Sequence, residues 1–133
     1  MSQTLPLITA CALVASGGAI GSVARHLFMR AFLGWTGSDG FPWALLGINT
    51  LGSFLMGLLL GWFYLNGGGT EGQRLFFAAG VLGGFTTFSA FSLEVILLFE
   101  KGAYLHAGAF MAGSVLAGVA AITLGLIIMG PAK

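Results

Sequence analysis

The chain has 133 residues, of which 57% are hydrophobic and 7% are charged, and its formal net charge is +1. Soluble domains carry about 25% charged residues, so this composition excludes a soluble protein and predicts an integral membrane protein. The small net charge and the lack of a basic cluster argue against a nucleic-acid partner. A single cysteine, Cys11, excludes an internal disulfide bond and a cysteine-based metal site.

Four apolar segments are long enough to cross a bilayer, for which a helix needs roughly 20 residues. The predicted transmembrane helices lie at about residues 5–29, 43–65, 74–99 and 104–129. No Lys or Arg precedes Arg25, so the first segment lacks the basic region of a cleaved signal peptide and is expected to remain as a span. We therefore expect an all-α membrane fold with a single transmembrane domain, residues 1–133.

Positive charge is almost evenly divided between the two sides of such a protein. Arg74 and Lys133 would lie on one side, and Arg25, Arg30 and Lys101 on the other. Because the asymmetry of Lys and Arg orients membrane proteins, near balance predicts insertion in both orientations and an antiparallel homodimer with dual topology. The alternative is a monomer that other signals, or one or two charges, orient.

The first two helices each contain one notable polar residue. Arg25 lies near the end of the first helix, and Asn49 lies about two turns into the second. The Arg25 guanidinium could draw anions into a vestibule, or it could extend to lipid headgroups. The Asn49 amide carries donors that could replace part of the hydration of an anion, although a buried asparagine also commonly fastens two helices together.

The third helix holds the densest group of polar residues, between Gly80 and Glu94. An unpaired polar group in hydrocarbon costs several kcal/mol, so these groups should face protein, water or an ion. Gly83 and Gly84 are weak helix formers, and beside the hydroxyls of Thr86 and Thr87 they are predicted to break the helix and free backbone carbonyls. Freed carbonyls at membrane depth can bind a cation. The alternative is a kinked helix whose carbonyls bond to nearby hydroxyls.

Two phenylalanines after this break, Phe88 and Phe91, share one helix face, with Ser89 and Ser92 beside them. Because the edge of an aromatic ring is positive, ring edges and hydroxyls together can hold a small anion. Aromatic residues at this spacing can also be ordinary packing.

Glu94 is a functional candidate as a membrane carboxylate, or it pairs with arginine or hydroxyls. No catalytic set of residues is present, so an enzyme is not expected.

The run from Gly83 to Ser92, Gly-Gly-Phe-Thr-Thr-Phe-Ser-Ala-Phe-Ser, resembles the most characteristic motif of the Fluc, or CrcB, fluoride-channel family. Residues 17–21, Gly-Gly-Ala-Ile-Gly, which lead to Arg25, resemble its first helix. Pro42 through residues 49–54, Asn-Thr-Leu-Gly-Ser-Phe, resemble its second helix. The resemblance covers essentially the whole chain.

This resemblance implies a passive fluoride-selective channel that exports cytoplasmic fluoride through the inner (plasma) membrane. The protein would be an antiparallel, dual-topology homodimer with two pores and a structural sodium ion at its centre. The implied sodium ligands are the backbone carbonyls of Gly83 and Thr86. The implied pore residues are the phenylalanine pair Phe88 and Phe91, the donor Asn49, the hydroxyl residues Thr87, Ser89 and Ser114, and the charged residues Glu94 and Arg25.

The sequence departs from the family pattern at several positions. Ala90 stands where threonine is usual, Ala44-Leu45 where Gly-Thr is common, Phe110 where tyrosine is frequent, and Gly118 at a frequently polar position. These differences concern the hydroxyl residues that line the implied pore, rather than the phenylalanine pair or the sodium site.

Two other functions fit the composition. A small dual-topology proton-coupled cation antiporter would have a similar length and charge balance. It commonly places an accessible carboxylate in its first helix, where this chain has Arg25 instead. The other is a non-transporting subunit of a larger membrane complex.

Overall fold

The computed structural model describes residues 4–33 and 40–129, and the regular structure in these ranges is helical. The elements are α1 (Leu7–Leu33), α2 (Trp43–Leu65), α3 (Glu71–Gln73), the π-helix η1 (Arg74–Leu82), α4 (Gly83–Phe85), α5 (Phe88–Glu100) and α6 (Tyr104–Met129). Four stretches are long and apolar enough to span a membrane, the third being the composite Glu71–Glu100. The prediction of four membrane-length helices with an interrupted third helix is confirmed.

The ends of two spans differ from the sequence prediction. α1 begins after Pro6 and continues to Leu33, so Arg25 lies about two turns inside the helix rather than near its end. The third span begins earlier because Thr70 and Gln73 form a capping box, in which each side chain accepts a hydrogen bond from the backbone N–H of the other residue, at 3.2 and 2.9 Å. α2 and α6 cover the same residues as the second and fourth predicted helices.

The third span is interrupted at Thr86 and Thr87, not at the glycine pair. Thr86 (φ −83°, ψ 161°) and Thr87 (φ −155°, ψ 124°) are extended, whereas Gly83 and Gly84 are helical. The two threonine hydroxyls support the break, because Thr86 Oγ1 donates to the Leu82 carbonyl at 2.9 Å and Thr87 Oγ1 accepts from the Ala90 N–H at 3.3 Å, capping α5.

Gly84 has a packing role that the sequence analysis did not assign to it. A Cβ atom at this position would lie 2.6 Å from the carbonyl oxygen of Gly18 on α1. Gly80 and Gly17 meet in the same way one turn away. The glycines therefore bring the backbones of α1 and the third span into contact, and the break follows them.

The segment Arg74–Leu82 is a π-helix, which the sequence analysis did not predict. π-helical turns are rare and are frequently found at functional sites. In this chain the π-helix leads through the single turn of α4 directly into the break.

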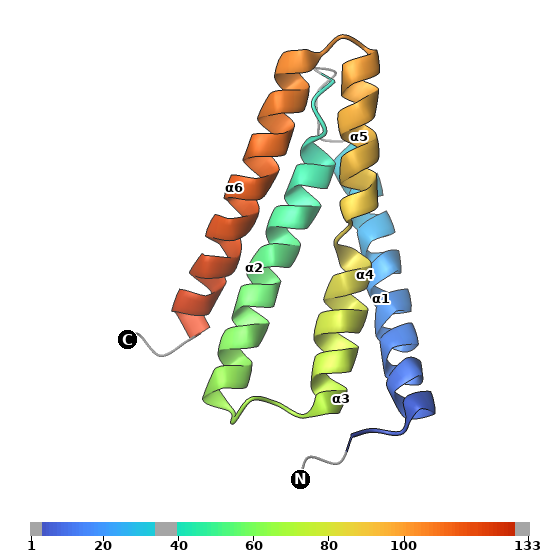
Figure 1. The fold of residues 1–133 in the computed structure, drawn as a ribbon, viewed down its shortest axis with the longest axis vertical. Helices are drawn as coiled ribbons and strands as arrows, with labels where there is room; N and C mark the ends of the chain where they lie inside the picture. Colours follow the sequence, from blue (N-terminus) through green and yellow to red (C-terminus); the bar gives the residue numbers. More distant parts are fainter. Residues whose placement is uncertain (1–3, 34–39, 130–133) are drawn as a thin grey trace.

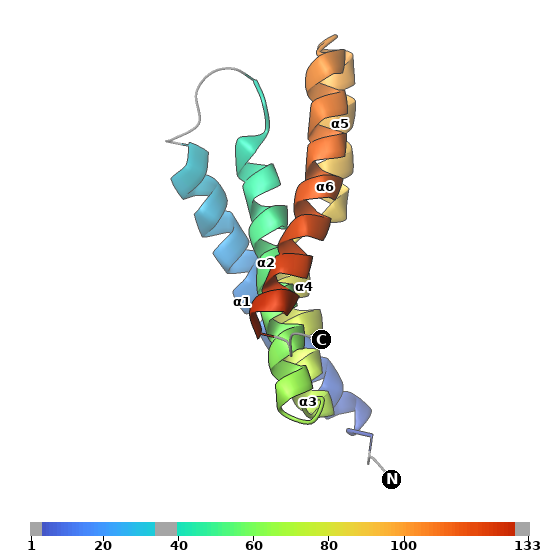
Figure 2. The ribbon, with the colours of Figure 1, turned by 90° about the vertical axis from the view of Figure 1, so that its left-hand side faces the viewer.

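The helices form two packed groups. α1 packs mainly on η1 and α4, while α6 packs mainly on α2 and also contacts α5. The start of α1, the α2–α3 connection and the end of α6 lie at one end of the molecule, and the α5–α6 connection lies at the other (Figure 1). Towards that second end, α1 diverges from the pair α5 and α6 (Figure 2). The buried core lies there, between α2, α5 and α6, and consists of Leu45, Val95, Leu98, Ala107 and Phe110.

Lys133, which entered the count of charges on the two sides of the membrane, lies outside the described residues.

Candidate functional site

The break in the third span is held by a side chain from a neighbouring helix. Asn49 Oδ1 on α2 accepts a hydrogen bond from the Thr87 N–H at 3.2 Å. Its Nδ2 lies 3.5 Å from the Thr87 carbonyl oxygen, which is a long contact for a hydrogen bond. The asparagine therefore takes the place of a backbone partner where the helix ladder stops. Of the two alternatives that the sequence left open for Asn49, this contact is the one that fastens two helices, since it joins α2 to the third span.

The break removes the ordinary helical donors from two carbonyls. In a continuous α-helix, the Gly83 carbonyl would accept from the Thr87 N–H, and the Thr86 carbonyl from the Ala90 N–H. Here the Thr87 N–H binds Asn49 and the Ala90 N–H binds the Thr87 hydroxyl. These two carbonyls are the ones that the family resemblance assigns to sodium, and uncharged peptide oxygens are suitable ligands for such a cation.

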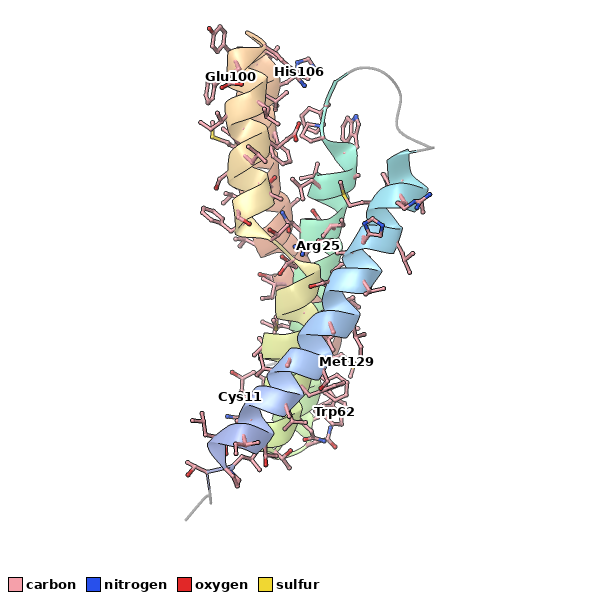
Figure 3. The ribbon with its side chains drawn as sticks, turned by 90° about the vertical axis from the view of Figure 1, so that its right-hand side faces the viewer. Cys11, Arg25, Trp62, Glu100, His106 and Met129 are labelled. Atoms are coloured by element: carbon pink, nitrogen blue, oxygen red, sulfur yellow. The ribbon has the colours of Figure 1, made fainter. Side chains whose placement is uncertain are left out.

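Arg25 reaches the same break from α1. Its Nη1 lies 3.5 Å from the Thr86 carbonyl oxygen, and Figure 3 shows the residue at the level of the break between α4 and α5. The guanidinium is therefore within the membrane-spanning part of the protein and not at the end of α1. Because the contact is long and a carbonyl oxygen has two lone pairs, it leaves acceptor capacity on Thr86.

A cavity of about 350 Å³ opens beside the break, between α2, α6 and the third span. Six residues of the predicted pore and sodium sites line it together: Asn49, Thr86, Thr87, Phe88, Phe91 and Ser114. The six other lining residues were not predicted to belong to a site, and among them Ser53 is the only one with a polar side chain. Ser53 follows Asn49 by one helical turn, which is the signal in the sequence that could have identified it.

The two predicted phenylalanines lie side by side but in different surroundings. The ring centroids of Phe88 and Phe91 are 5.6 Å apart. Phe91 continues into a row of rings, because its centroid lies 5.2 Å from that of Phe110, which is fully buried. Phe88 is 80% exposed in the single chain. The core thus fixes Phe91, while Phe88 stands out from the surface beside the cavity.

The hydroxyls around the cavity differ in how far they are already used. Thr87 Oγ1 and Ser89 Oγ share a hydrogen bond at 3.2 Å. Ser92 Oγ donates to the Phe88 carbonyl at 3.0 Å. Ser114 Oγ is buried and has no hydrogen-bond partner within the described part of the chain. Such an orphan is uncommon in proteins and calls for a water molecule or an ion as its partner.

Three predicted pore residues do not line the cavity of the single chain. Arg25 points to the break from α1, Ser89 is exposed on the first turn of α5, and Glu94 is half-buried further along α5. The chain by itself therefore brings together the amide, the two rings and two of the predicted hydroxyls, but not the two charged residues.

Comparison with known proteins gives one consistent result. Residues 12–126 match the family described as CrcB-like protein, Camphor Resistance (CrcB). A protein of Novosphingobium aromaticivorans is 51% identical over 92% of this chain and 97% of its own length. Proteins of Phenylobacterium zucineum (50%; 87% of this chain, 91% of its own length) and Erythrobacter litoralis (46%; 95% and 96%) are similarly close. All three relatives carry the name fluoride-specific ion channel FluC.

Proposed function

The chain belongs to the CrcB family of fluoride-specific ion channels, and on this premise we propose that fluoride crosses the membrane passively through the cavity beside Asn49, Phe88 and Ser114. The protein is a multi-pass membrane protein and not an enzyme. We place it in the inner (plasma) membrane, where such a pore would release cytoplasmic fluoride.

The unpartnered hydroxyl of Ser114 carries the proposal. It is a buried donor facing a cavity that also contains an amide and two phenylalanine rings. Fluoride is small and strongly hydrated, so a pore must replace its water with donors of similar strength. Neutral hydroxyls, an amide and positive ring edges do so without the fixed charge that would bind the ion too tightly to release it.

The Gly83 and Thr86 carbonyls would hold a structural sodium ion. Both lose their helical donors at the break, and peptide oxygens are ligands that alkali cations accept in membrane proteins. When bound, the ion would supply a positive charge near the middle of the membrane. The chain's part is to divert the helical donors from the two carbonyls, which it does through Asn49 and the Thr87 hydroxyl.

The functional unit would be an antiparallel homodimer with two pores. Ser89 is exposed in the middle of a span, and Phe88 is 80% exposed beside it. A polar group at this depth needs protein, water or an ion next to it, and a second copy would supply that surface. The near balance of positive charge supports insertion in both orientations.

Reconstitution of the purified protein in liposomes tests the transport class. A fluoride electrode would record efflux with and without an imposed proton gradient. Efflux that does not depend on the gradient is the result that we expect from a channel. Efflux that requires the gradient would instead favour a proton-coupled antiporter, and no flux from purified protein would favour a non-transporting subunit.

A further inference from the structure

We propose that Ser53 is a further fluoride-contacting residue, whose hydroxyl donates to the anion from the α2 wall of the cavity. This inference rests on the proposed function, because it concerns the path of the same ion. Ser53 lines the cavity together with Asn49 on α2 and Ser114 on α6.

The Ser53 hydroxyl is not used by its own helix, in contrast to several other hydroxyls in these helices. Serine and threonine within helices commonly donate to a carbonyl one turn earlier. Ser16 does so to Ala12 at 2.7 Å, and Thr123 to Val119 at 2.8 Å. The described part of the structure gives Ser53 no such bond, and the same is true of Ser114. Ser53 and Ser114 both line the cavity beside the break, where their hydroxyls can serve a ligand.

The position of Gly118 explains where the Ser53 hydroxyl points. A Cβ atom at Gly118 would have Ser53 Oγ as its nearest neighbour, at 3.4 Å. The hydroxyl therefore faces α6, in the space that the missing side chain of Gly118 leaves open. Asn49 and Ser53 are one turn apart on α2, and Ser114 and Gly118 are one turn apart on α6.

The Ser53 hydroxyl extends the series of hydrogen-bond donors along the cavity, which otherwise consists of the Asn49 amide and the Ser114 hydroxyl. Asn49 and Ser114 lie nearer the break, and Ser53 adds a neutral hydroxyl one turn, about 5.4 Å, further along α2 towards Met56. At this level the hydroxyl comes from α2, because Gly118 on α6 has no side chain. Fluoride leaving the ring edges would meet this donor before the apolar end of the cavity at Met56 and Ile122.

The sharpest test compares Ser53→Thr with Ser53→Val, because these side chains are nearly isosteric and differ by the hydroxyl. S53V lacks the hydroxyl that would donate to the ion, so we expect its fluoride efflux to be about tenfold or more slower than that of S53T. S53T should conduct like the unmodified protein. Ser16→Ala and Thr123→Val remove hydroxyls that are already bonded to helix carbonyls, and both should leave efflux unchanged.

Equal efflux from S53T and S53V would overturn the role of Ser53. The proposed channel function would still stand if the unmodified protein conducts. If neither bulkier variant conducts, Ser53→Ala alone and combined with Gly118→Ser decides the question. Recovery of efflux in the double variant supports a hydroxyl donor in this space, and failure to recover any efflux contradicts it.

Discussion

Asn49 on α2 binds the backbone of Thr87 in the interrupted third span, accepting its N–H at 3.2 Å. One amide thereby joins the helix pair α2 and α6 to the break. The same bond diverts the donor that the Gly83 carbonyl would otherwise have. Asn49 therefore both lines the proposed pore and binds the donor that would otherwise occupy the Gly83 carbonyl, one of the two proposed sodium ligands.

Loss of the Asn49–Thr87 bond should reduce both the stability of the protein and its transport of fluoride. Asn49→Ala leaves the Thr87 N–H without its partner inside the protein, which costs about 1–3 kcal/mol. We expect the free energy of unfolding to fall by that amount and fluoride efflux to fall with it. Unfolding in detergent and efflux from liposomes measure the two effects. A variant with full stability and full efflux would show that the amide does neither task.

Phe88→Ile is predicted to abolish fluoride efflux while the oligomeric state is retained. The ring is 80% exposed in the single chain, so its removal costs little packing energy within it, whereas an aliphatic side chain has no positive edge for the anion. Phe77→Ile, which changes an exposed ring on η1, is the matched control. Undiminished efflux from F88I would remove Phe88 from the pore.

Gly84→Ala is predicted to destabilise the protein by about 1–3 kcal/mol, because the added methyl group meets the Gly18 carbonyl oxygen. Gly18→Ala is the matched control on the other side of the same contact, since a Cβ at Gly18 has no atom within 4 Å. The free energies of unfolding of the two variants should therefore differ clearly. If they are equal, α1 and α4 are not packed backbone to backbone.

The sequence predicts the positions of the membrane-spanning helices better than it predicts their internal irregularities. Hydropathy locates α2 and α6 because their apolar runs end at clear breakers. It does not reveal the π-helix Arg74–Leu82, because a uniformly apolar run looks the same for either helical period. The break was predicted at Gly83 and Gly84 from helix propensity, but close packing keeps Gly84 helical, and the extended residues are the two threonines.

In the candidate site, the sequence identifies residues at motif positions but not the neighbours that helix packing brings to them. Its amide, rings and hydroxyls could be named from motif positions, since they follow one another along helix faces. Phe110 was recognised only as a departure from the pattern, yet it is fully buried against Phe91. Ser53 entered the sequence analysis only within residues 49–54, the run that resembles the second helix of the family. Only the packing of α2 on α6 shows that its hydroxyl faces the cavity.

Replacing sodium is predicted to weaken the proposed dimer and reduce fluoride efflux, because the Gly83 and Thr86 carbonyls would then lack the proposed cation. Prolonged dialysis into a buffer whose only cation is N-methylglucamine would remove such an ion. Size-exclusion chromatography and efflux report the two effects, and restoring sodium should reverse both. Unaltered efflux and oligomeric state after dialysis would argue against a structural cation at this break.

The most direct measurement of the central claim is the efflux of fluoride and of chloride from liposomes that contain only this protein, with a potassium ionophore to balance charge. We predict that fluoride leaves rapidly while chloride is retained, because the donors around Asn49, Phe88 and Ser114 suit the smaller ion. Equal release of both anions, or retention of fluoride, would contradict the account.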